Sequence, residues 1–296
     1  MKLLFSLFLG IALFGPCGGV LQAQENNDTV TATEMRRIRK SAKQGDTDAE
    51  YLLGLCYANG NGVAKDVVVA VTWYRKAAEH GVGRAQNNLG NCYTKGKGVA
   101  KDAAKAVKWY RKAAEQGIRQ AQNNLANCYA KGDGVVKDVA EAVRWYRKAA
   151  ELGSASSQYN LGLCYYEGKG VAQDATKAVR WYRKAAEQGH ADGQYDLGLC
   201  YYRGEGVVED AAEAVKWYRK AAAQGIAIAQ YNLGYRYSKG DGVAKDNVVA
   251  LMWSNLAVAS GFEHAKKFGE RLEKEMTVAQ IAKAQWLSKV WKPCPD

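Results

Sequence analysis

The chain has 296 residues, of which 48% are hydrophobic and 24% are charged. This hydrophobic content is ample for a continuous core and excludes a chain too polar to fold. The 42 Lys and Arg residues outnumber the 30 Asp and Glu residues, and the formal net charge of +12 means that polyanions must be considered as partners.

Residues 1–23 have the pattern of a secretory signal peptide. Lys2 precedes an apolar run from Leu3 to Phe14, and Leu21-Gln22-Ala23 predicts cleavage after Ala23. The run is too short to span a membrane as a stable helix. A lipoprotein would use Cys17 as its lipid acceptor, which the preceding Pro16 fits poorly. We therefore expect an exported protein that is soluble after signal peptide removal and has no membrane span.

Residues 24–48 are predicted to be a disordered lead followed by an N-terminal capping helix. Residues 24–32 are polar, and chain ends of this kind are often poorly ordered. Residues 39–45 match the end of the unit that repeats downstream, but Arg37 and Ile38 stand where that unit has a Trp-Tyr pair. This helix should therefore have a more polar outer face.

Residues 49–264 contain six tandem copies of one 36-residue unit. A fixed period in this range is typical of stacked repeat architectures, and it argues for one elongated solenoid. The units are 49–84, 85–120, 121–156, 157–192, 193–228 and 229–264.

Each unit is predicted to be a helical hairpin. In the second unit Ala85, Leu89 and Tyr93 share one face of a first helix that ends at Gly96. Asp102 should cap a second helix that buries Tyr110. Because only neighbouring units can cover these apolar faces, the fold class is all-α. We expect a right-handed α-solenoid of stacked antiparallel helix hairpins with terminal capping helices.

Residues 265–296 are predicted to be C-terminal capping helices. A polar helix is expected near Ala265–Lys274, and Thr277 with Gln280 forms a capping box that opens a last helix through about Val290. Trp286 and Trp291 lie on this helix, where they would cover the last exposed apolar face. The alternative is that they dock a membrane or a partner.

The units read L-G-x-C-Y-x-x-G-x-G-V…D…A-V-x-W-Y-R-K-A-A-E-Q-G, which resembles the Sel-one-like repeat, a relative of the tetratricopeptide repeat. The tetratricopeptide repeat itself has a period of about 34 residues and ends in a proline, and no proline lies in a repeat here. The resemblance to bacterial members of the family implies a periplasmic or secreted location.

Seven cysteines raise the question of disulfides. Equivalent residues of successive hairpins should lie about 8–10 Å apart, whereas a disulfide needs Cα atoms within about 7 Å. We expect free thiols that act as small hydrophobic side chains, with Cys294 exposed near the end of the chain. The five repeat cysteines are Cys56, Cys92, Cys128, Cys164 and Cys200.

No cofactor and no metal are expected. His80, His190 and His264 lie in different units without ligand spacing, and the glycine-rich loops lack the context of a phosphate-binding loop. Cysteine-rich relatives of the resembled family are described as binding or cleaving penicillin, but S-x-x-K, S-D-N and K-T-G are absent. We therefore predict that the protein is not an enzyme. The alternative is a β-lactam or cell-wall-related hydrolase or binder.

A basic ladder runs along the second helices, and glutamates partly neutralise it. We expect a solvated face, and the alternative is attachment to an anionic envelope surface. Export argues against nucleic acid as a partner. The ladder consists of Arg75-Lys76, Arg111-Lys112, Arg147-Lys148, Arg183-Lys184 and Arg219-Lys220.

A ligand is expected on the exposed side of the first helices, which lines the concave groove in relatives with this architecture. This stripe should bind a protein or peptide, so that the protein acts as a periplasmic scaffold or adaptor for protein–protein interaction. Tyr166, Tyr195 and Tyr202 form its expected centre and should bind without supporting the fold. The nearly uniform Asn88, Asn124, Asn160, Asp196 and Asn232 are assigned to structural hydrogen bonds. The predicted groove residues are Asn87, Asn91, Lys95, Asn123, Asn127, Lys131, Tyr159, Tyr166, Tyr195, Tyr202, Tyr231 and Tyr235.

Overall fold

The computed structural model describes residues 30–291, and within this range it contains fifteen helices and no strand. The predicted signal peptide, most of the predicted disordered lead and Cys294 lie outside the described residues. The helices are α1 (Ala32–Lys43), α2 (Thr47–Asn59), α3 (Val67–Glu79), α4 (Gly83–Lys95), α5 (Ala103–Glu115), α6 (Arg119–Lys131), α7 (Val139–Glu151), α8 (Ala155–Glu167), α9 (Ala175–Glu187), α10 (Ala191–Arg203), α11 (Ala211–Ala223), α12 (Ala227–Lys239), α13 (Asn247–Ala259), α14 (His264–Glu273) and α15 (Val278–Val290).

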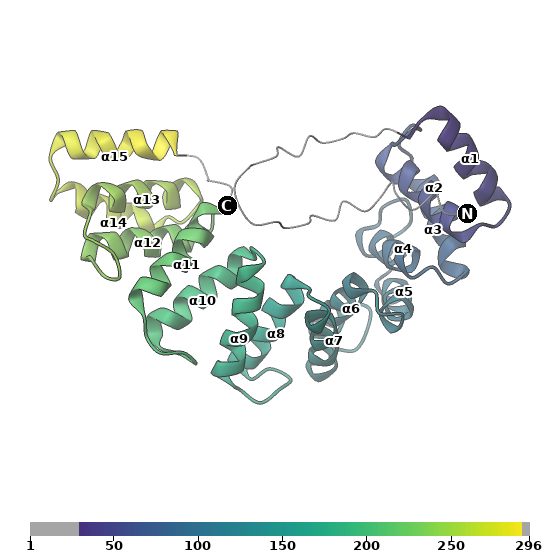
Figure 1. Cartoon of the computed structure of the whole chain (residues 1–296), viewed down its shortest axis with the longest axis horizontal. Coiled ribbons are helices and arrows are strands. Elements are labelled where there is room, and N and C mark those ends of the chain that lie inside the picture. The colour runs from purple at the N-terminus through teal and green to yellow at the C-terminus, as the bar shows by residue number, and fades with distance from the viewer. Residues whose placement is uncertain (1–29, 292–296) are drawn as a thin grey trace, which may run out of the picture.

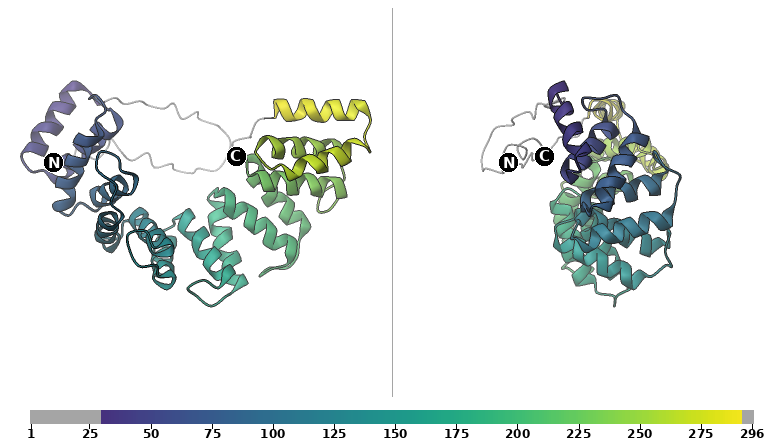
Figure 2. Two further views of the ribbon diagram at one scale, coloured as in Figure 1. Left: turned by 180° about the vertical axis from the view of Figure 1, so that it is seen from behind. Right: turned by 90° about the vertical axis from the view of Figure 1, so that its right-hand side faces the viewer.

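The helices stack into an arc in the order of the sequence (Figure 1). From α2 to α12 each helix packs mainly on the helix before it and the helix after it, and α13 packs on α12, α14 and α15. The even-numbered first helices α4, α6 and α8 lie on the inner side of the arc, and their partners α5, α7 and α9 lie on the outer side (Figure 1). Figure 2 shows the same arc from behind and along its length. The predicted all-α solenoid of stacked hairpins is confirmed.

The signals that end and begin helices within a unit are confirmed. Gly96 closes α4 in the left-handed conformation, with φ +66°. The Asp102 carboxylate accepts a hydrogen bond from the Lys105 backbone N–H at 2.9 Å and so caps α5. The first helices begin two residues before our unit boundaries, at Gly83 rather than Ala85 for example, because a periodic sequence fixes the length of a unit more firmly than its starting point.

Buried glutamines join each unit to the unit before it. Near the start of α4, Gln86 Nε2 donates at 3.0 Å to the backbone oxygen of Ala78 in the last turn of α3. Four more glutamines repeat this bond at 3.1 to 3.2 Å. The Ala78 oxygen also accepts from the Gly81 backbone N–H at 3.1 Å, so the glutamine gives a second donor to a carbonyl at the buried joint. The four are Gln122, Gln158, Gln194 and Gln230.

A second set of side-chain bonds latches the two helices of one unit together. Gln116, at the end of α5, donates to Gln86 Oε1 at 2.9 Å, and Gln188 and Gln224 repeat this contact with Gln158 and Gln194. In the first unit the contact of His80 Nδ1 with the carboxylate of the buried Glu50, at 2.9 Å, takes this place. The third unit has Leu152 there, 52% exposed, and Gln122 Oε1 is left buried without a partner.

Both ends of the solenoid are closed by helices. At the C-terminus, α14 lies within one residue of its predicted bounds, and the Thr277–Gln280 capping box of α15 is confirmed. Trp291 packs edge-on against Trp253 with ring centroids 5.2 Å apart, whereas Trp286 is 60% exposed. Among residues 30–291, no helix is both long enough and apolar enough to cross a membrane.

The missing latch of the third unit leads to a test of stability. Replacing Leu152 with Gln should give Gln122 Oε1 its donor and raise the free energy of unfolding by about 1 kcal/mol. Leu152→Ala is the matched control, because it removes the exposed leucine without supplying a donor. Urea denaturation of both variants measures the difference, and equal stabilities for the two would contradict the role assigned to the latch.

Candidate functional site: the concave groove

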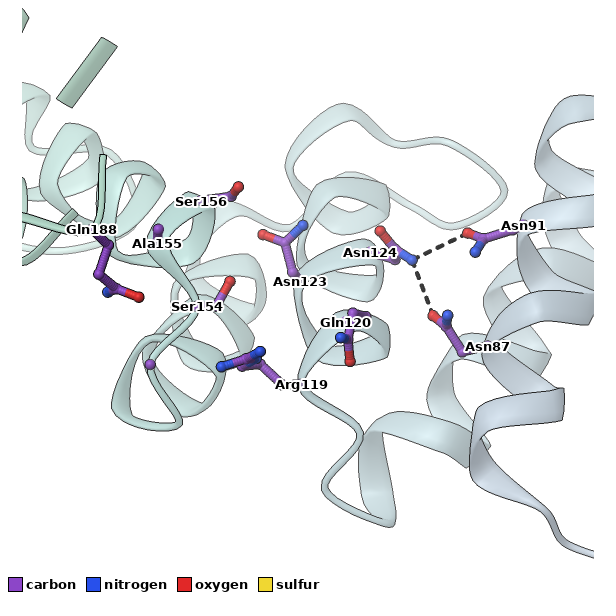
Figure 3. A pocket seen from close by; sticks show the side chains of 11 residues that line it. Asn87, Asn91, Arg119, Gln120, Asn123, Asn124, Ser154, Ala155, Ser156 and Gln188 are labelled. Atoms are coloured by element: carbon purple, nitrogen blue, oxygen red, sulfur yellow. Dashed lines mark hydrogen bonds between the residues drawn. The ribbon is translucent and has the colours of Figure 1, made fainter. Parts of the chain in front are cut away.

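The first helices are bonded to one another along the inner side of the arc. Asn124 Nδ2 on α6 donates to Asn87 Oδ1 at 3.1 Å and to Asn91 Oδ1 at 3.2 Å, both on α4 (Figure 3). On the other side of α6, Asn123 Oδ1 accepts from Ser157 Oγ of α8 at 2.8 Å. A hollow of about 490 Å³ lies over this network, between α4, α6 and the start of α8. It is lined by Asn87, Asn91, Arg119, Gln120, Asn123, Asn124, Gly153, Ser154, Ala155, Ser156 and Gln188.

The hollow has hydrogen-bond donors to spare. The oxygen of Asn91 also accepts from the Tyr110 hydroxyl at 2.8 Å, and the oxygen of Asn127 accepts from the Tyr146 hydroxyl at 2.6 Å. With the Asn123 oxygen bound to Ser157, the side-chain amide nitrogens of Asn91 and Asn123 remain without a partner in the described part of the chain, as does that of Asn127 one turn further along α6, outside the hollow. Arg119 donates only to the Leu152 backbone oxygen, at 3.1 Å. The amide oxygens of Gln120, Asn124 and Gln188 also line the hollow, but no carboxylate does, so Arg119 gives it a net positive charge.

The tyrosines of the next two units occupy the same stripe in a different way. Tyr159 packs beside the core Tyr182, with ring centroids 5.8 Å apart, and Tyr195 packs beside Tyr218 at 5.9 Å. In the second and third units the equivalent core tyrosines are bonded by Asn91 and Asn127 instead. The division of the stripe into an amide half and an aromatic half thus follows from two ways of covering the same buried tyrosine.

Several predicted groove residues serve the fold. Asn87 is buried, so its expected exposure is wrong. Tyr231 and Tyr235 pack on Phe268 of the capping helix α14, at 5.6 and 5.9 Å between ring centroids.

The aromatic centre is also less free than expected. Tyr195 and Tyr202 are half-buried, and the Arg236 guanidinium lies 4.0 Å from the centre of the Tyr202 ring. Tyr166 donates to Glu205 at 2.6 Å. The expectation that these tyrosines bind without supporting the fold is wrong for Tyr195 and Tyr202, because both are packed against the chain itself. Lys95 and Lys131 are exposed as predicted.

The side chains of the basic ladder make contacts within the chain, which a purely solvated face would not make. Each arginine donates to a tyrosine hydroxyl eighteen residues later, as Arg111 does to Tyr129 and Arg183 to Tyr201. Each lysine lies over the tryptophan three residues before it, as Lys148 does over Trp145 at 4.2 Å. The ladder therefore ties neighbouring helices together.

Asp196 is the functional candidate that the sequence analysis missed, because it was grouped with the structural asparagines. Burial raises its pKa to about 6, and the nearby Asp192 and Glu167 carboxylates act in the same direction, while a hydrogen bond from Tyr159 opposes them. No lysine or arginine offsets this charge. The signal was present in the sequence, since the second, third, fourth and sixth units have Asn at this position.

The histidines and cysteines have structural surroundings. His190 Nδ1 accepts from the Gly193 backbone N–H at 3.2 Å, and its ring stacks on Tyr159 at 4.6 Å. The five repeat cysteines are free and at least half-buried. Burial raises the pKa of Cys128 and Cys164 to about 11 and that of Cys200 to about 12. In residues 30–291 no group of three His, Cys, Asp or Glu side chains is placed to hold a metal ion.

A family model described as the Sel1 repeat matches the chain six times, at residues 47–82, 83–118, 119–154, 155–190, 191–226 and 227–262. The chain belongs to the Sel1 repeat family. These boundaries coincide with the starts of the first helices, two residues before the boundaries read from the sequence.

Two solved structures show how far the similarity extends. The Sel1 repeat chain is 39% identical to c5321, a protective antigen of uropathogenic Escherichia coli with an SLR fold, at a TM-score of 0.80. That match covers 87% of this chain but only 56% of the antigen's chain. A Sel1 repeat protein from Oxalobacter formigenes is 37% identical, with a TM-score of 0.69 and coverage of 76% and 90% of the two chains. No curated protein matches the chain.

The raised thiol pKa values predict slow reaction of the Sel1 repeat cysteines. For the chain from Gln24 onward, a thiol reagent at pH 8 should modify about one cysteine, Cys294, before urea is added and six afterwards. Fewer than six in urea without reductant would reveal disulfides. Rapid modification of several cysteines in the native protein would contradict their burial.

Asp196 predicts a stability that depends on pH. A carboxyl group titrates near pH 4 in the unfolded chain and near pH 6 here. Between these values the folded state holds a proton that the unfolded state has lost, so the free energy of unfolding falls as the pH rises. Asp196→Asn should remove this cost, which raises the free energy of unfolding by about 2 kcal/mol at pH 7.5 and changes it little at pH 4. The exposed Asp192→Asn is the control, and equal gains at both pH values would refute the assignment.

Proposed function

We propose that this Sel1 repeat protein is a non-catalytic scaffold that binds an extended segment of a protein partner in its concave groove. The observation that carries the proposal is the surplus of donors in the hollow over α4, α6 and α8. Backbone carbonyls and carboxylates of a peptide are acceptors, and an extended peptide offers them at regular intervals. With the signal peptide predicted for residues 1–23, the partner would be periplasmic or extracellular.

The charge of the groove also gives a bound peptide a direction. The hollow has Arg119 and free amide nitrogens, with Lys95 and Lys131 on the same helices. Two units further along, the Asp196 and Asp192 carboxylates have no cation beside them. A peptide that places its carboxylate end over α4 and α6 and its amino end over α10 satisfies both charges.

The rival functions have weaker support. A hydrolase of the penicillin-cleaving kind needs an activated nucleophile, whereas burial raises the pKa of all five repeat thiols and so suppresses the reactive thiolate. The arginines and lysines of the basic ladder are held against tyrosines and tryptophans of the chain, which restrains their side chains but leaves their charges in place, so attachment to an envelope surface through the ladder is a second candidate supported by charge alone.

A matched pair of charge substitutions tests the groove. Gln120 lines the hollow, is exposed, and makes no hydrogen bond through its side chain in the described structure. Gln120→Glu places a negative charge beside the carbonyl and carboxylate groups of the bound peptide. The resulting repulsion should weaken binding about tenfold. The acid lies in the first turn of α6, where the helix dipole favours it, so the fold should not suffer.

The ligand for this test is a peptide selected from a random display library on the wild-type protein, and its Kd is measured by calorimetry. Gln285→Glu on α15 makes the same chemical change far from the groove and should leave the Kd unchanged. If selected peptides bind both variants alike, the hollow is not their site. If no peptide is enriched over the background, the peptide-binding function itself is rejected.

A further inference from the structure

α1 is a version of the second helix of a repeat in which the charge balance has changed. It stands 36 residues before α3, and Arg39 donates to the Tyr57 hydroxyl at 3.2 Å, as the ladder arginines do in the repeats. Arg37, however, stands where Trp73 and its equivalents lie. Lys43 stands where four of the units have a glutamate. In the repeats, the tryptophan and the glutamate at these two positions reduce the exposed positive charge of the ladder. In α1 both positions carry cations.

These changes leave a dense positive face. Lys40 has lost the tryptophan that covers the equivalent lysines, and it has Arg37 and Lys43 three residues away on either side. All five cations of α1 are exposed, and none has a carboxylate within ion-pairing distance in the described structure. They are Arg36, Arg37, Arg39, Lys40 and Lys43. Four of them line a shallow hollow of about 400 Å³ on the surface of the helix.

The position of α1 makes this face available. α1 packs on α2 and lies at the tip of the arc, and among residues 30–291 no helix lies beyond it (Figure 1). Met35 and Ala42 are buried against the solenoid, so the apolar side of the helix is already used. The acid in its first turn, Glu34, is held in the capping box with Thr31.

We propose that α1 is a docking surface for anionic phospholipid headgroups. No large apolar side chain of α1 is exposed, whereas protein interfaces concentrate their energy in aromatic anchors and single-stranded nucleic acids stack on aromatic rings. A surface that offers only positive charge is complementary to the dense array of phosphate groups on an anionic lipid leaflet. Each lysine or arginine near an anionic leaflet adds to an electrostatic attraction that salt screens.

Sedimentation with lipid vesicles tests the proposal. The protein should bind vesicles of phosphatidylglycerol and phosphatidylcholine at 50 mM salt, bind pure phosphatidylcholine at least tenfold less, and be released at 500 mM salt. The triple variant Arg36→Glu, Lys40→Glu, Lys43→Glu should lose at least tenfold in binding. Because acids near the end of a helix disturb it, the neutral variant Arg36→Gln, Lys40→Gln, Lys43→Gln is included and should lose an intermediate amount.

A control variant separates the α1 face from net charge. Lys108→Glu, Lys137→Glu and Arg180→Glu together make the same charge change on exposed residues of other units, and this variant should stay within about twofold of the wild type. An equal loss in the control, or equal binding to both kinds of vesicle, would overturn the proposal. Tighter binding of a duplex DNA than of the vesicles, lost in the α1 variants, would reassign the surface to nucleic acid.

Discussion

The solenoid depends on how each second helix ends. Its last buried carbonyl accepts from the backbone N–H three residues later, at 3.1 Å for Gly81 and Ala78, and its second lone pair is open to the joint with the next unit. A glutamine near the start of the following helix supplies the donor, at 3.0 Å in the case of Gln86 and Ala78. The joint is therefore polar, and the bond also fixes the register in which the next hairpin packs. Leucines of the first helices, such as Leu89 and Leu125, can then be fully buried in line with one another.

The groove inherits its chemistry from the same core. In the first five units a tyrosine of the second helix reaches the inner side of the arc and must be covered there. Asn91 and Asn127 cover it by accepting from its hydroxyl, and their nitrogens then face the groove. Tyr159 and Tyr195 cover it by packing beside its ring. The same structural requirement is met in two ways, which creates a donor-rich half and an aromatic half of the groove. The residues that hold the fold are therefore also residues that line the groove.

The sequence was sufficient for the architecture because the relevant signals are local. A glycine such as Gly96 ends a helix, an aspartate such as Asp102 begins one, and the period shows that both recur. The groove was harder to predict, since its side chains are set by contacts between residues 19 to 39 apart, such as Tyr166 with Glu205. Helix geometry alone does not reveal that Asn87 is buried by its neighbour or that Arg236 covers Tyr202. The exceptions to the repeat, Leu152 and Asp196, were visible in the sequence, but their meaning depended on knowing the partners that they lack or replace.

Contacts restricted to chain neighbours have an evolutionary consequence. A unit can be duplicated or deleted by recombination between near-identical segments of the gene, and every surviving joint still finds its glutamine and its carbonyl. Helix α1 and the pair α14 and α15 close the two ends of the described solenoid. The reach of the arc can therefore change between lineages in whole units.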